Sequence, residues 1–595
     1  MRSLDRGTVR PLLFVAGCFG VAVLRCGGGA GGPPQDLIDG EVAGWTCNQE
    51  DPCGAVNYVA GLAETGVAHV NACCAGDAAP DGTMAHPYTS IGSALAAAKE
   101  GGTVAVAAGL YEESVKVDKP VVLIGAGSDR TTVHSTDDNA TLHLSGVESV
   151  TISGFALSGT GGVGLFVENS KSVSLSDVAI SGYQVGQSWH VGLGLYVADS
   201  TGVNAVGLDV SGNSAYGILF ARSTGTVSGS VIRDNGTGCA TAGVAVVDSS
   251  ALTLGMMEAH ADFAQAGVID AGGCSVHDNK GVGLYVAQSM ADVNGVDFSA
   301  NLCGGIVVFG APQEGAASSV TGSIVQAAGR FGLGLHGSSA VIAGNQFKDV
   351  TGVAGEYQGH CLVATQSLVE GVTVTIQDNQ FDGCAGAGIF LDGALTAEVS
   401  GNQLGGLASA GIWAQGGVDA SEIANNFLDG AGAAGIAVTD GSHALVVGNT
   451  VTASHDASMV DFDEGEVVTM ADGILVSKID APGAVLIEKN TVTLAHRAGI
   501  IVDRTTEKSV AFGPGNIVAG NEAGGISLQK GAEGIADAQE LDSLVQFDME
   551  DVDPNGGDGD ILLGKDFPVV TSMGSPASPQ LCIPPACHDV TGSGL

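Results

Sequence analysis

The sequence is poor in charged, basic and aromatic residues. Charged residues make up 14% of its 595 positions and aromatic residues 5%, whereas about 25% charged residues are usual in soluble proteins. The chain has 21 Lys and Arg against 64 Asp and Glu, so its formal net charge is −43. A surface this negative repels phosphate backbones, which argues against nucleic acid as a partner. The core is therefore expected to consist of small and β-branched side chains.

The chain also lacks an apolar run of about 20 residues, which argues against an integral membrane protein. Its first ten residues instead contain three Arg residues, and the mostly apolar stretch Pro11–Leu24 follows them. A positive leader ahead of an apolar run of this length is typical of a secretory signal peptide. We therefore expect residues 1–30 to be an export segment and the protein to be located in the cell envelope or secreted.

Residues 15–18 resemble a bacterial lipoprotein cleavage box, in which Cys18 would take the lipid. The sequence departs from that pattern because apolar residues follow Cys18 where polar residues are usual. An ordinary cleavage after Ala30 is the alternative. Attachment to a membrane is expected only through this lipid.

No CxxC pair occurs among the 13 cysteines. A zinc site is therefore disfavoured, because the loops also lack histidines at ligand spacing. Export permits disulfides, and we expect them among six cysteines near the two ends of the chain, although the sequence does not give their pairing. These six are Cys47, Cys53, Cys73, Cys74, Cys582 and Cys587.

What the sequence has in excess is glycine, 94 residues, and much of it belongs to one repeated motif. The motif is Gly, an apolar residue, a variable residue and a second apolar residue, and it recurs about every 28 residues, a period typical of solenoids. Alternation within it predicts a strand with two side chains pointing inward. The motif glycines are Gly164, Gly194, Gly217, Gly243, Gly283, Gly305, Gly388, Gly411, Gly435, Gly473, Gly499 and Gly525. The glycine excess also suits coil corners that need positive φ.

An Asn residue precedes most of these motifs, from Asn213 to Asn516. Asn tolerates the left-handed backbone of a tight turn. In stacked coils, Asn side chains can also hydrogen-bond from one coil to the next, as in the ladders of stacked sheets. We interpret this repetition as structural.

With these repeats, the chain resembles the right-handed parallel β-helix proteins of the pectin lyase-like superfamily over roughly residues 80 to 530. Its opening, from Asp81-Gly82-Thr83 to Gly109-Leu110-Tyr111, is typical of exported bacterial members. The resemblance implies an all-β solenoid with a short capping helix near residues 91–99. The apolar stripe of Ile91, Ala94, Leu95 and Ala98 supports that helix independently.

The predicted organisation has four parts. An export segment covers residues 1–30, and a Cys-containing extension covers residues 31–80. The β-helix covers residues 81–530, and an acidic tail with a Cys pair covers residues 531–595. Longer intervals after Gly243 and Gly435 indicate loop insertions, which in solenoids often lie on a binding face.

The resemblance implies fold and not activity. Known enzymes of the superfamily include polyuronate lyases, pectin esterases, galacturonan hydrolases and alginate epimerases. Their hydrolase and esterase signatures are absent here, apart from isolated fragments at Asp137-Asp138 and Gly359-His360. A hydrolase also needs two carboxylates flanking one bond, and no repeat position supplies an obvious pair.

One set of residues shares a repeat position. Asp440, Lys478, Arg504 and Lys530 each lie five residues after a motif glycine. Equal offsets on stacked coils place such side chains in one column. Phe390 and Trp413 occupy the outward strand position beside it and would form an aromatic platform. Phe166, Tyr196 and Tyr285 occupy the same outward position in earlier coils.

This arrangement has two interpretations. The first is a carbohydrate-binding groove, in which sugar rings stack on Phe390 and Trp413 and glycan carboxylates pair with Lys478, Arg504 and Lys530. If the protein were a lyase, Lys478 or Arg504 would be the candidate base. The second is a solvated column of turn residues whose charges pair locally and contribute little.

No cofactor is required by this chemistry, and calcium is the one candidate. Residues 551–556 have the first spacings of a calcium loop, although Leu562 stands where a bidentate Glu would complete it. The candidate ligands are Asp551, Asp553, Asn555 and Asp558.

The sequence thus favours an exported envelope β-helix that binds carbohydrate or another cell-surface component, or that acts as a surface interaction scaffold. A polysaccharide lyase or hydrolase acting on an acidic glycan is the alternative.

Overall fold

The computed structural model describes most of the chain between residues 57 and 573. The described residues are 57–61, 66–74, 79–136, 140–184, 192–255, 273–310, 317–352, 359–366, 371–460, 467–506, 508–530, 532, 538–547, 554–556, 560–563, 567–570 and 572–573. The predicted export segment with Cys18 lies outside this part of the chain. So do Cys47, Cys53, Cys582 and Cys587.

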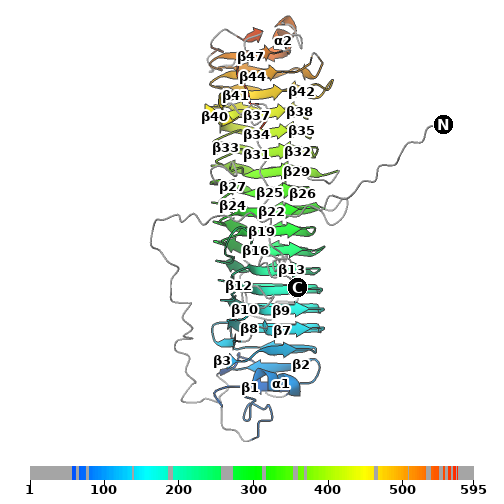
Figure 1. The fold of residues 1–595 in the computed structure, drawn as a ribbon, viewed down its shortest axis with the longest axis vertical. Coiled ribbons are helices and arrows are strands. Elements are labelled where there is room, and N and C mark those ends of the chain that lie inside the picture. The colour runs from blue at the N-terminus through cyan, green and yellow to red at the C-terminus, as the bar shows by residue number, and fades with distance from the viewer. Residues whose placement is uncertain are drawn as a thin grey trace, which may run out of the picture. The chain divides into compact units, whose positions relative to one another are not determined.

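The described coils stack into one right-handed parallel β-helix, which confirms the predicted fold class (Figure 1). Each coil contributes strands to three parallel ladders. Ladder 1 consists of β4 (Val115–Val117), β7 (Ala140–Ser145), β9 (Val163–Glu168), β11 (Leu193–Ala198), β13 (Tyr216–Ala221), β16 (Ala242–Val247), β19 (Val282–Ala287), β22 (Gly304–Phe309), β25 (Leu333–His336), β28 (Leu362–Thr365), β31 (Ile389–Asp392), β34 (Ile412–Gln415), β37 (Ala433–Thr439), β41 (Val467–Ser477), β44 (Ala498–Asp503), β47 (Gly524–Gln529) and β49 (Ile561–Leu563).

Ladder 2 follows ladder 1 along each coil. It consists of β1 (Val67–Val70), β2 (Gly102–Val106), β5 (Val121–Ile124), the first parts of β8 (Glu148–Gly159), β10 (Lys171–Ser181) and β12 (Thr201–Ser211), then β14 (Thr224–Ser228), β17 (Ala251–Gly255), β20 (Met290–Asn294), β23 (Ala317–Thr321), β26 (Ser339–Ala343), β29 (Thr373–Gln377), β32 (Thr396–Ser400), β35 (Asp419–Ala424), β38 (His443–Val447), β42 (Val485–Glu488) and β45 (Val510–Phe512).

Ladder 3 completes each coil. It consists of β3 (Gly109–Glu112), β6 (Thr131–Ser135), the second parts of β8, β10 and β12, then β15 (Val231–Arg233), β18 (Ser275–His277), β21 (Asp297–Ser299), β24 (Ile324–Gln326), β27 (Gln346–Lys348), β30 (Gln380–Asp382), β33 (Gln403–Leu407), β36 (Phe427–Ala431), β39 (Thr450–Thr452), β43 (Thr491–Thr493), β46 (Asn516–Ala519) and β48 (Val545–Gln546). Outside the ladders, β40 (Ala457–Val460) pairs antiparallel with the start of β41.

The predicted capping helix is present as α1 (Ile91–Ala97). Ser90 caps it, because its side chain accepts a hydrogen bond from the Ser93 backbone N–H. Ile91 and Leu95 are buried, and α1 contacts β1, β2 and β4 at the N-terminal end of the coils. At the other end, α2 (Ala538–Leu544) contacts β48. Strand pairing thus begins before residue 81, at β1, and continues after residue 530, through β48 and β49.

The core is a set of vertical columns of aliphatic side chains. In ladder 1, one inward column is completely buried on six successive coils and consists of Leu165, Leu195, Ile218, Val244, Leu284 and Ile306. No coil alone can bury such a strip, so burial of apolar surface, which stabilises by about 25 cal/mol per Å², depends on stacking. Neither helix in the described part of the chain is long and apolar enough to cross a membrane.

The motif glycines are required by close packing rather than by backbone conformation. None of the twelve has a positive φ, whereas many glycines at the coil corners do, so the expected use of glycine at such corners is confirmed for residues outside the motif. A Cβ on Gly217 would lie 2.7 Å from the Asn235 Nδ2 and 2.7 Å from the carbonyl oxygen of Gly243 on the next coil. A Cβ on Gly435 would overlap Val451 Cγ1 and lie 2.7 Å from the oxygen of Gly473. Any side chain at these positions would push two coils apart.

The Asn residues form two buried ladders at two different corners. Asn213, Asn235, Asn279 and Asn301 follow ladder 3, where Asn213 Nδ2 donates to Asn235 Oδ1 at 2.9 Å. The second run lies between ladders 2 and 3 and repeats the same bond, for example from Asn402 Nδ2 to Asn426 Oδ1 at 2.9 Å. This run consists of Asn345, Asn379, Asn402, Asn426, Asn449, Asn490 and Asn516. The structural interpretation of these Asn residues is confirmed.

We expect Gly435→Ala to lower the free energy of unfolding by about 3 kcal/mol, because the overlapping atoms belong to a neighbouring backbone and a buried Val side chain. Chemical denaturation followed by far-ultraviolet circular dichroism measures this loss.

Gly238→Ala is the matched control, since a Cβ there meets no atom within 4 Å. Equal stability of the Gly435→Ala and Gly238→Ala proteins would contradict the packing role of the motif glycines.

Candidate functional site

The outward face of ladder 1 carries two side-chain columns that run along the β-helix. We call the first the ring column, because its members include Phe166, Tyr196, Phe390 and Trp413. The second, called the neighbouring column, lies two residues further along each strand and includes Glu168, Gln415 and Asp503. Strand register therefore places like positions on successive coils above one another, as the sequence predicts.

Phe390 and Trp413 are neighbours in the ring column, but neither is accessible. Both have 0% of their surface exposed, because they pack in an apolar cluster with Met459, Met470 and residues of the C-terminal segment. The prediction that they form an exposed stacking platform is therefore wrong. The sequence could not reveal the cover, since part of it comes from Val569, Val570 and Met573, more than a hundred positions away.

The predicted charged column exists as a column of turn residues. Asp440, Lys478, Arg504 and Lys530 all have positive φ, between 44° and 56°, directly after a strand of ladder 1. Backbone hydrogen bonds link Asp440 to the coil of Lys478, and Lys478 to the coil of Arg504. Arg504 Nε lies 3.3 Å from Asp503 Oδ2, and Lys478, Arg504 and Lys530 each have an interaction partner. Local pairing at Arg504 agrees with the second of the two interpretations.

Aromatic side chains that do reach the surface lie at the other end of the ring column. His143, Phe166 and Tyr196 are half-buried on β7, β9 and β11. The His143 and Phe166 rings stack with centroids 4.9 Å apart, as do the Phe166 and Tyr196 rings. Because their faces cover one another, the rings present their edges, which carry the positive part of the ring quadrupole.

Charged side chains flank this ring stack. Glu168 Oε1 accepts hydrogen bonds from Ser145 Oγ at 2.9 Å and lies 3.0 Å from His143 Nε2. At the following corner, Arg222 holds Asp199 through two contacts, at 2.7 and 2.9 Å. Its remaining nitrogen lies 3.3 Å from Asp248.

We call this surface the N-terminal strip. It consists of His143, Phe166, Glu168, Tyr196, Asp199, Arg222 and Asp248. The sequence placed Phe166 and Tyr196 in the outward column. His143 was missed because its coil has Thr141 in place of the motif glycine.

Electrostatics within the strip are set by Arg222. Hydrogen bonds from the Arg222 guanidinium lower the pKa of Asp199 below its usual value. Burial raises the pKa of Tyr196, and the charge of Arg222 partly offsets that effect. At neutral pH Asp199 is therefore ionised beside the Arg222 guanidinium, and Tyr196 is a neutral phenol.

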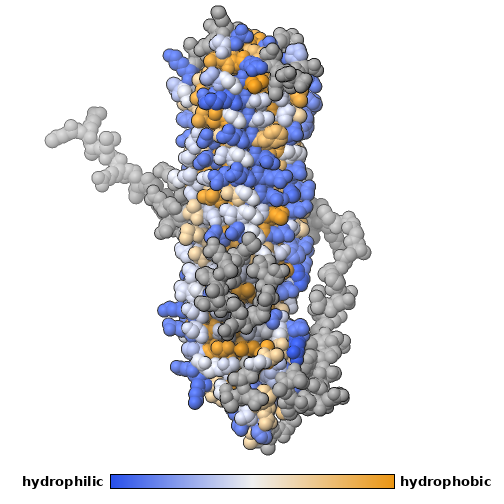
Figure 2. Space-filling view, turned by 180° about the vertical axis from the view of Figure 1, so that it is seen from behind, coloured by the Kyte–Doolittle hydropathy of each residue, from blue (hydrophilic) through white to orange (hydrophobic). Residues whose placement is uncertain are grey.

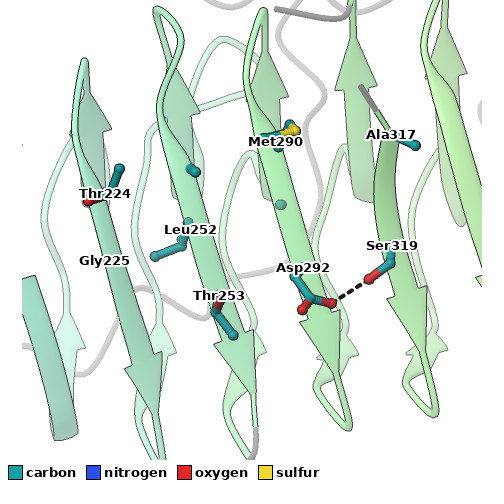
Figure 3. Close-up of a pocket in the computed structure, with 10 residues that line it drawn as sticks. Thr224, Gly225, Leu252, Thr253, Met290, Asp292, Ala317 and Ser319 are labelled. Carbon is teal, nitrogen blue, oxygen red and sulfur yellow. Dashed lines mark hydrogen bonds between the residues drawn. The ribbon is translucent and has the colours of Figure 1, made fainter. Parts of the chain in front are cut away.

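A separate groove of about 500 Å³ lies on ladder 2, across β14, β17, β20 and β23 (Figure 3). Its lining is mostly small side chains such as Ala251, Thr253 and Ala317. The single carboxylate, Asp292, accepts a hydrogen bond from Ser319. Figure 2 shows one side of the molecule, where polar residues cover much of the upper coils and apolar residues form short bands.

One of the four calcium candidates, Asn555, lies in the described part of the chain. Its Oδ1 accepts hydrogen bonds from the Asn521 backbone N–H and from Asn521 Nδ2, at 3.1 and 2.9 Å. This oxygen therefore forms a separate Asn–Asn pair between two coils, of the same kind as in the two ladders. Asp551, Asp553 and Asp558 lie outside the described residues, so the calcium site stays a prediction. Among the described residues, no group of three or more His, Cys, Asp or Glu side chains could hold a metal ion.

Two disulfides form that the sequence did not predict. Cys239 pairs with Cys303, and Cys361 pairs with Cys384 on the adjacent coil. Cys361 occupies a degenerate motif position and Cys384 follows it by 23 residues, about one coil, which is the signal that could have identified the second pair. Of the six cysteines expected to form disulfides, Cys73 and Cys74 are disulfide-bonded.

His336 and His360 are two buried histidines of neighbouring coils. His360 stacks on Phe390 with ring centroids 4.8 Å apart, and its Nδ1 accepts the Ala387 backbone N–H at 2.9 Å. Burial lowers the pKa of His360 to about 3 and that of His336 to about 4. Both imidazoles are therefore neutral at pH 7.

Comparison with known proteins identifies a family. A model described as the right handed beta helix region matches residues 123–256 and 367–536, about half of the chain. Comparison with curated proteins gives no match. Among solved structures, the catalytic domain of a GH87 alpha-1,3-glucanase is similar at 12% identity and a TM-score of 0.34. The alignment covers 61% of this chain and 62% of that domain, less than two thirds of its length.

An alginate lyase from Paenibacillus sp. is similar at 14% identity and a TM-score of 0.29, with 53% of this chain and 92% of that chain covered. The A-module of a mannuronan C-5 epimerase from Azotobacter vinelandii is similar at 12% identity and a TM-score of 0.24, with 80% and 91% covered. Similarities at this level carry no argument about activity.

We expect stability to fall below pH 6.5 because of the two buried histidines. Their pKa is about 6.5 in the unfolded chain and is lowered on folding, so protons bind preferentially to the unfolded chain. The stabilising contribution is complete above pH 6.5 and decreases towards pH 3–4, by up to about 1.4 kcal/mol per pH unit for each histidine. Denaturant unfolding at a series of pH values measures the slope.

His360→Asn keeps an acceptor for the Ala387 N–H. It should reduce the slope of the unfolding free energy against pH by the contribution of one histidine, because one fewer proton is taken up on unfolding. The exposed His443 provides the control variant, His443→Asn. If His360→Asn left the slope unchanged, burial of a neutral His360 would be contradicted.

Proposed function

Because the chain belongs to the right-handed β-helix family, its surface is organised in columns along stacked coils, and we propose that it binds an extended neutral polysaccharide along the N-terminal strip. The observation that carries this proposal is the half-buried stack of His143, Phe166 and Tyr196 beside Glu168 and Arg222.

The strip suits an oxygen-rich chain lying parallel to the β-helix. Ring centroids repeat every 4.9 Å, close to the length of one sugar unit in an extended glycan. The positive ring edges attract hydroxyl oxygens. Carboxylates of Glu168, Asp199 and Asp248 accept hydrogen bonds from hydroxyl groups, and the phenol of Tyr196 can donate or accept one. Each sugar unit would thus meet an apolar edge and a polar group.

Charge selects the class of glycan. The strip has more carboxylates than cations, and the whole chain carries −43. An acidic polysaccharide would be repelled by this field, most strongly at low ionic strength. A neutral glycan meets no such penalty, so the strip favours it over the acidic glycan considered from the sequence.

Export of the protein is part of the proposal. Disulfides persist in oxidising compartments, and the two disulfides of the coils fit a protein outside the cytoplasm. The N-terminal segment Met1–Ala30 has the sequence features of an export signal. An envelope or secreted scaffold meets polysaccharide in that location.

We expect Phe166→Ala to weaken binding of a neutral glycan about tenfold, since removing the central ring breaks both stacks and loses about 1.4 kcal/mol of contact. Affinity electrophoresis in gels containing neutral glucans or galactomannans measures the retardation. Gels containing alginate or polygalacturonate should show less retardation.

Phe427→Ala is the matched control, because Phe427 is an exposed ring, 48% accessible, on ladder 3. Equal effects of the two substitutions, or stronger binding to the acidic gels at low salt, would refute the proposed site.

A further inference from the structure

A segment near the C-terminus runs along the outside of ladder 1 and covers several coils. We call it the strap, and it consists of residues 567–570 and 572–573. Val569, Val570 and Met573 are buried in the same apolar cluster as Trp413, Leu475 and Ile501. The strap thus covers the later part of the ring column, on the same outward face that carries the N-terminal strip.

Two glutamines of the neighbouring column hold the strap by its backbone. Gln415 Nε2 donates to the Met573 carbonyl at 2.6 Å, and the Met573 N–H donates to Gln415 Oε1 at 2.8 Å. Gln529 makes the same paired contact with Phe567, at 2.8 and 2.7 Å. Arg497 adds a hydrogen bond to the Pro568 carbonyl at 2.7 Å and lies over the Phe567 ring.

The covered face is more polar than a core requires. Gln415, Thr439, Ser477, Asp503 and Gln529 occupy the neighbouring column on five successive coils, and each is at most 4% exposed. On this face, Trp413 Nε1 of the ring column and Thr439 Oγ1 of the neighbouring column are buried without a hydrogen-bond partner in the described part of the chain. A buried polar group without a partner costs about 1–3 kcal/mol, so the strap satisfies this surface only in part.

We propose that the strap is a displaceable latch over a second binding surface for a hydroxyl-rich ligand of the class proposed for the N-terminal strip. Sugar hydroxyl oxygens would accept from Trp413 Nε1, and hydroxyl groups would both donate to and accept from Thr439. The amides of Gln415 and Gln529, once released from the strap, offer a paired donor and acceptor to neighbouring hydroxyls. This inference rests on the proposed function for the ligand class alone.

A latch lowers the apparent affinity of the surface beneath it by the fraction of molecules in which it is open. The strap belongs to none of the three ladders, so its release breaks no strand pairing of ladder 1. Binding at this surface would thus be controlled by the C-terminal segment while the coils stay folded.

Opening is tested with Val570→Asp, which places a carboxylate in an apolar cluster and leaves every proposed ligand-binding side chain in place. In a Trp45→Phe/Trp189→Phe background, Trp413 is the only remaining Trp. We expect acrylamide to quench it several-fold more strongly than in the parent. A chain ending at residue 566 is the second variant, and Leu563→Asp is the matched control because Leu563 is 54% exposed.

Ligand binding is then measured on neutral-glycan gels with Phe166→Ala added, which removes the N-terminal strip. The latch variants should bind at least about tenfold more tightly than Phe166→Ala alone, and a synthetic peptide of residues 567–573 should reverse the gain. Three results would each overturn the latch. Trp413 could stay protected from acrylamide in both variants, or Val570→Asp could lower the unfolding midpoint of the coils. Trp413 could also become exposed without any gain in glycan binding.

The two proposals fail separately. If Phe166→Ala has no effect in the full chain but the latch variants gain binding, the N-terminal strip is wrong and the latch stands. If Phe166→Ala abolishes binding and the latch variants recover none, the latch is wrong and the strip stands.

Discussion

Vertical register between coils is the constraint on which the rest of this structure depends. A glycine at the start of most ladder 1 strands lets the next coil approach, and a buried Asn amide at a corner bonds to the Asn of the next coil. A shift by one residue would place side chains against the glycine and leave the amides without partners, at a cost of about 1–3 kcal/mol each. Glycine contact and amide ladder therefore select the same register independently.

Because register is fixed from inside, the outward positions are free to vary. The ring column changes from His143, Phe166 and Tyr196, through a mixed stretch of aliphatic, small and aromatic residues, to Phe390 and Trp413, while the inward column stays aliphatic. Each coil contacts only its neighbours, so a change of surface character need not disturb distant coils. Function on such a scaffold resides in short stretches of a column, and two stretches of the same column can differ in accessibility.

The repeats in the sequence were sufficient to predict the β-helix and the neighbouring positions of Phe390 and Trp413 in one column, and the resemblance together with the apolar stripe near residue 91 predicted α1. They fixed inward and outward positions because period-2 alternation is local. They could not predict burial of Trp413, since its cover includes Met573, or the pairing of Cys239 with Cys303, which depends on a loop path. The presence of two Asn corners could have been predicted from spacing. Asn213 lies four residues before its motif glycine, whereas Asn402 lies nine residues before its own.

The coils unfold cooperatively, whereas the strap can open locally. Removal of one coil would expose apolar columns on two sides, so the coils resist opening together, whereas the strap rests on one face through side-chain contacts. Local opening occurs first in segments with the fewest buried contacts. The strap is therefore the part of this surface that can open at the lowest cost. The Trp413 and Thr439 polar atoms beneath it, which have no hydrogen-bond partner among the described residues, lower that cost further. Access to the covered column is thereby separated from the stability of the fold.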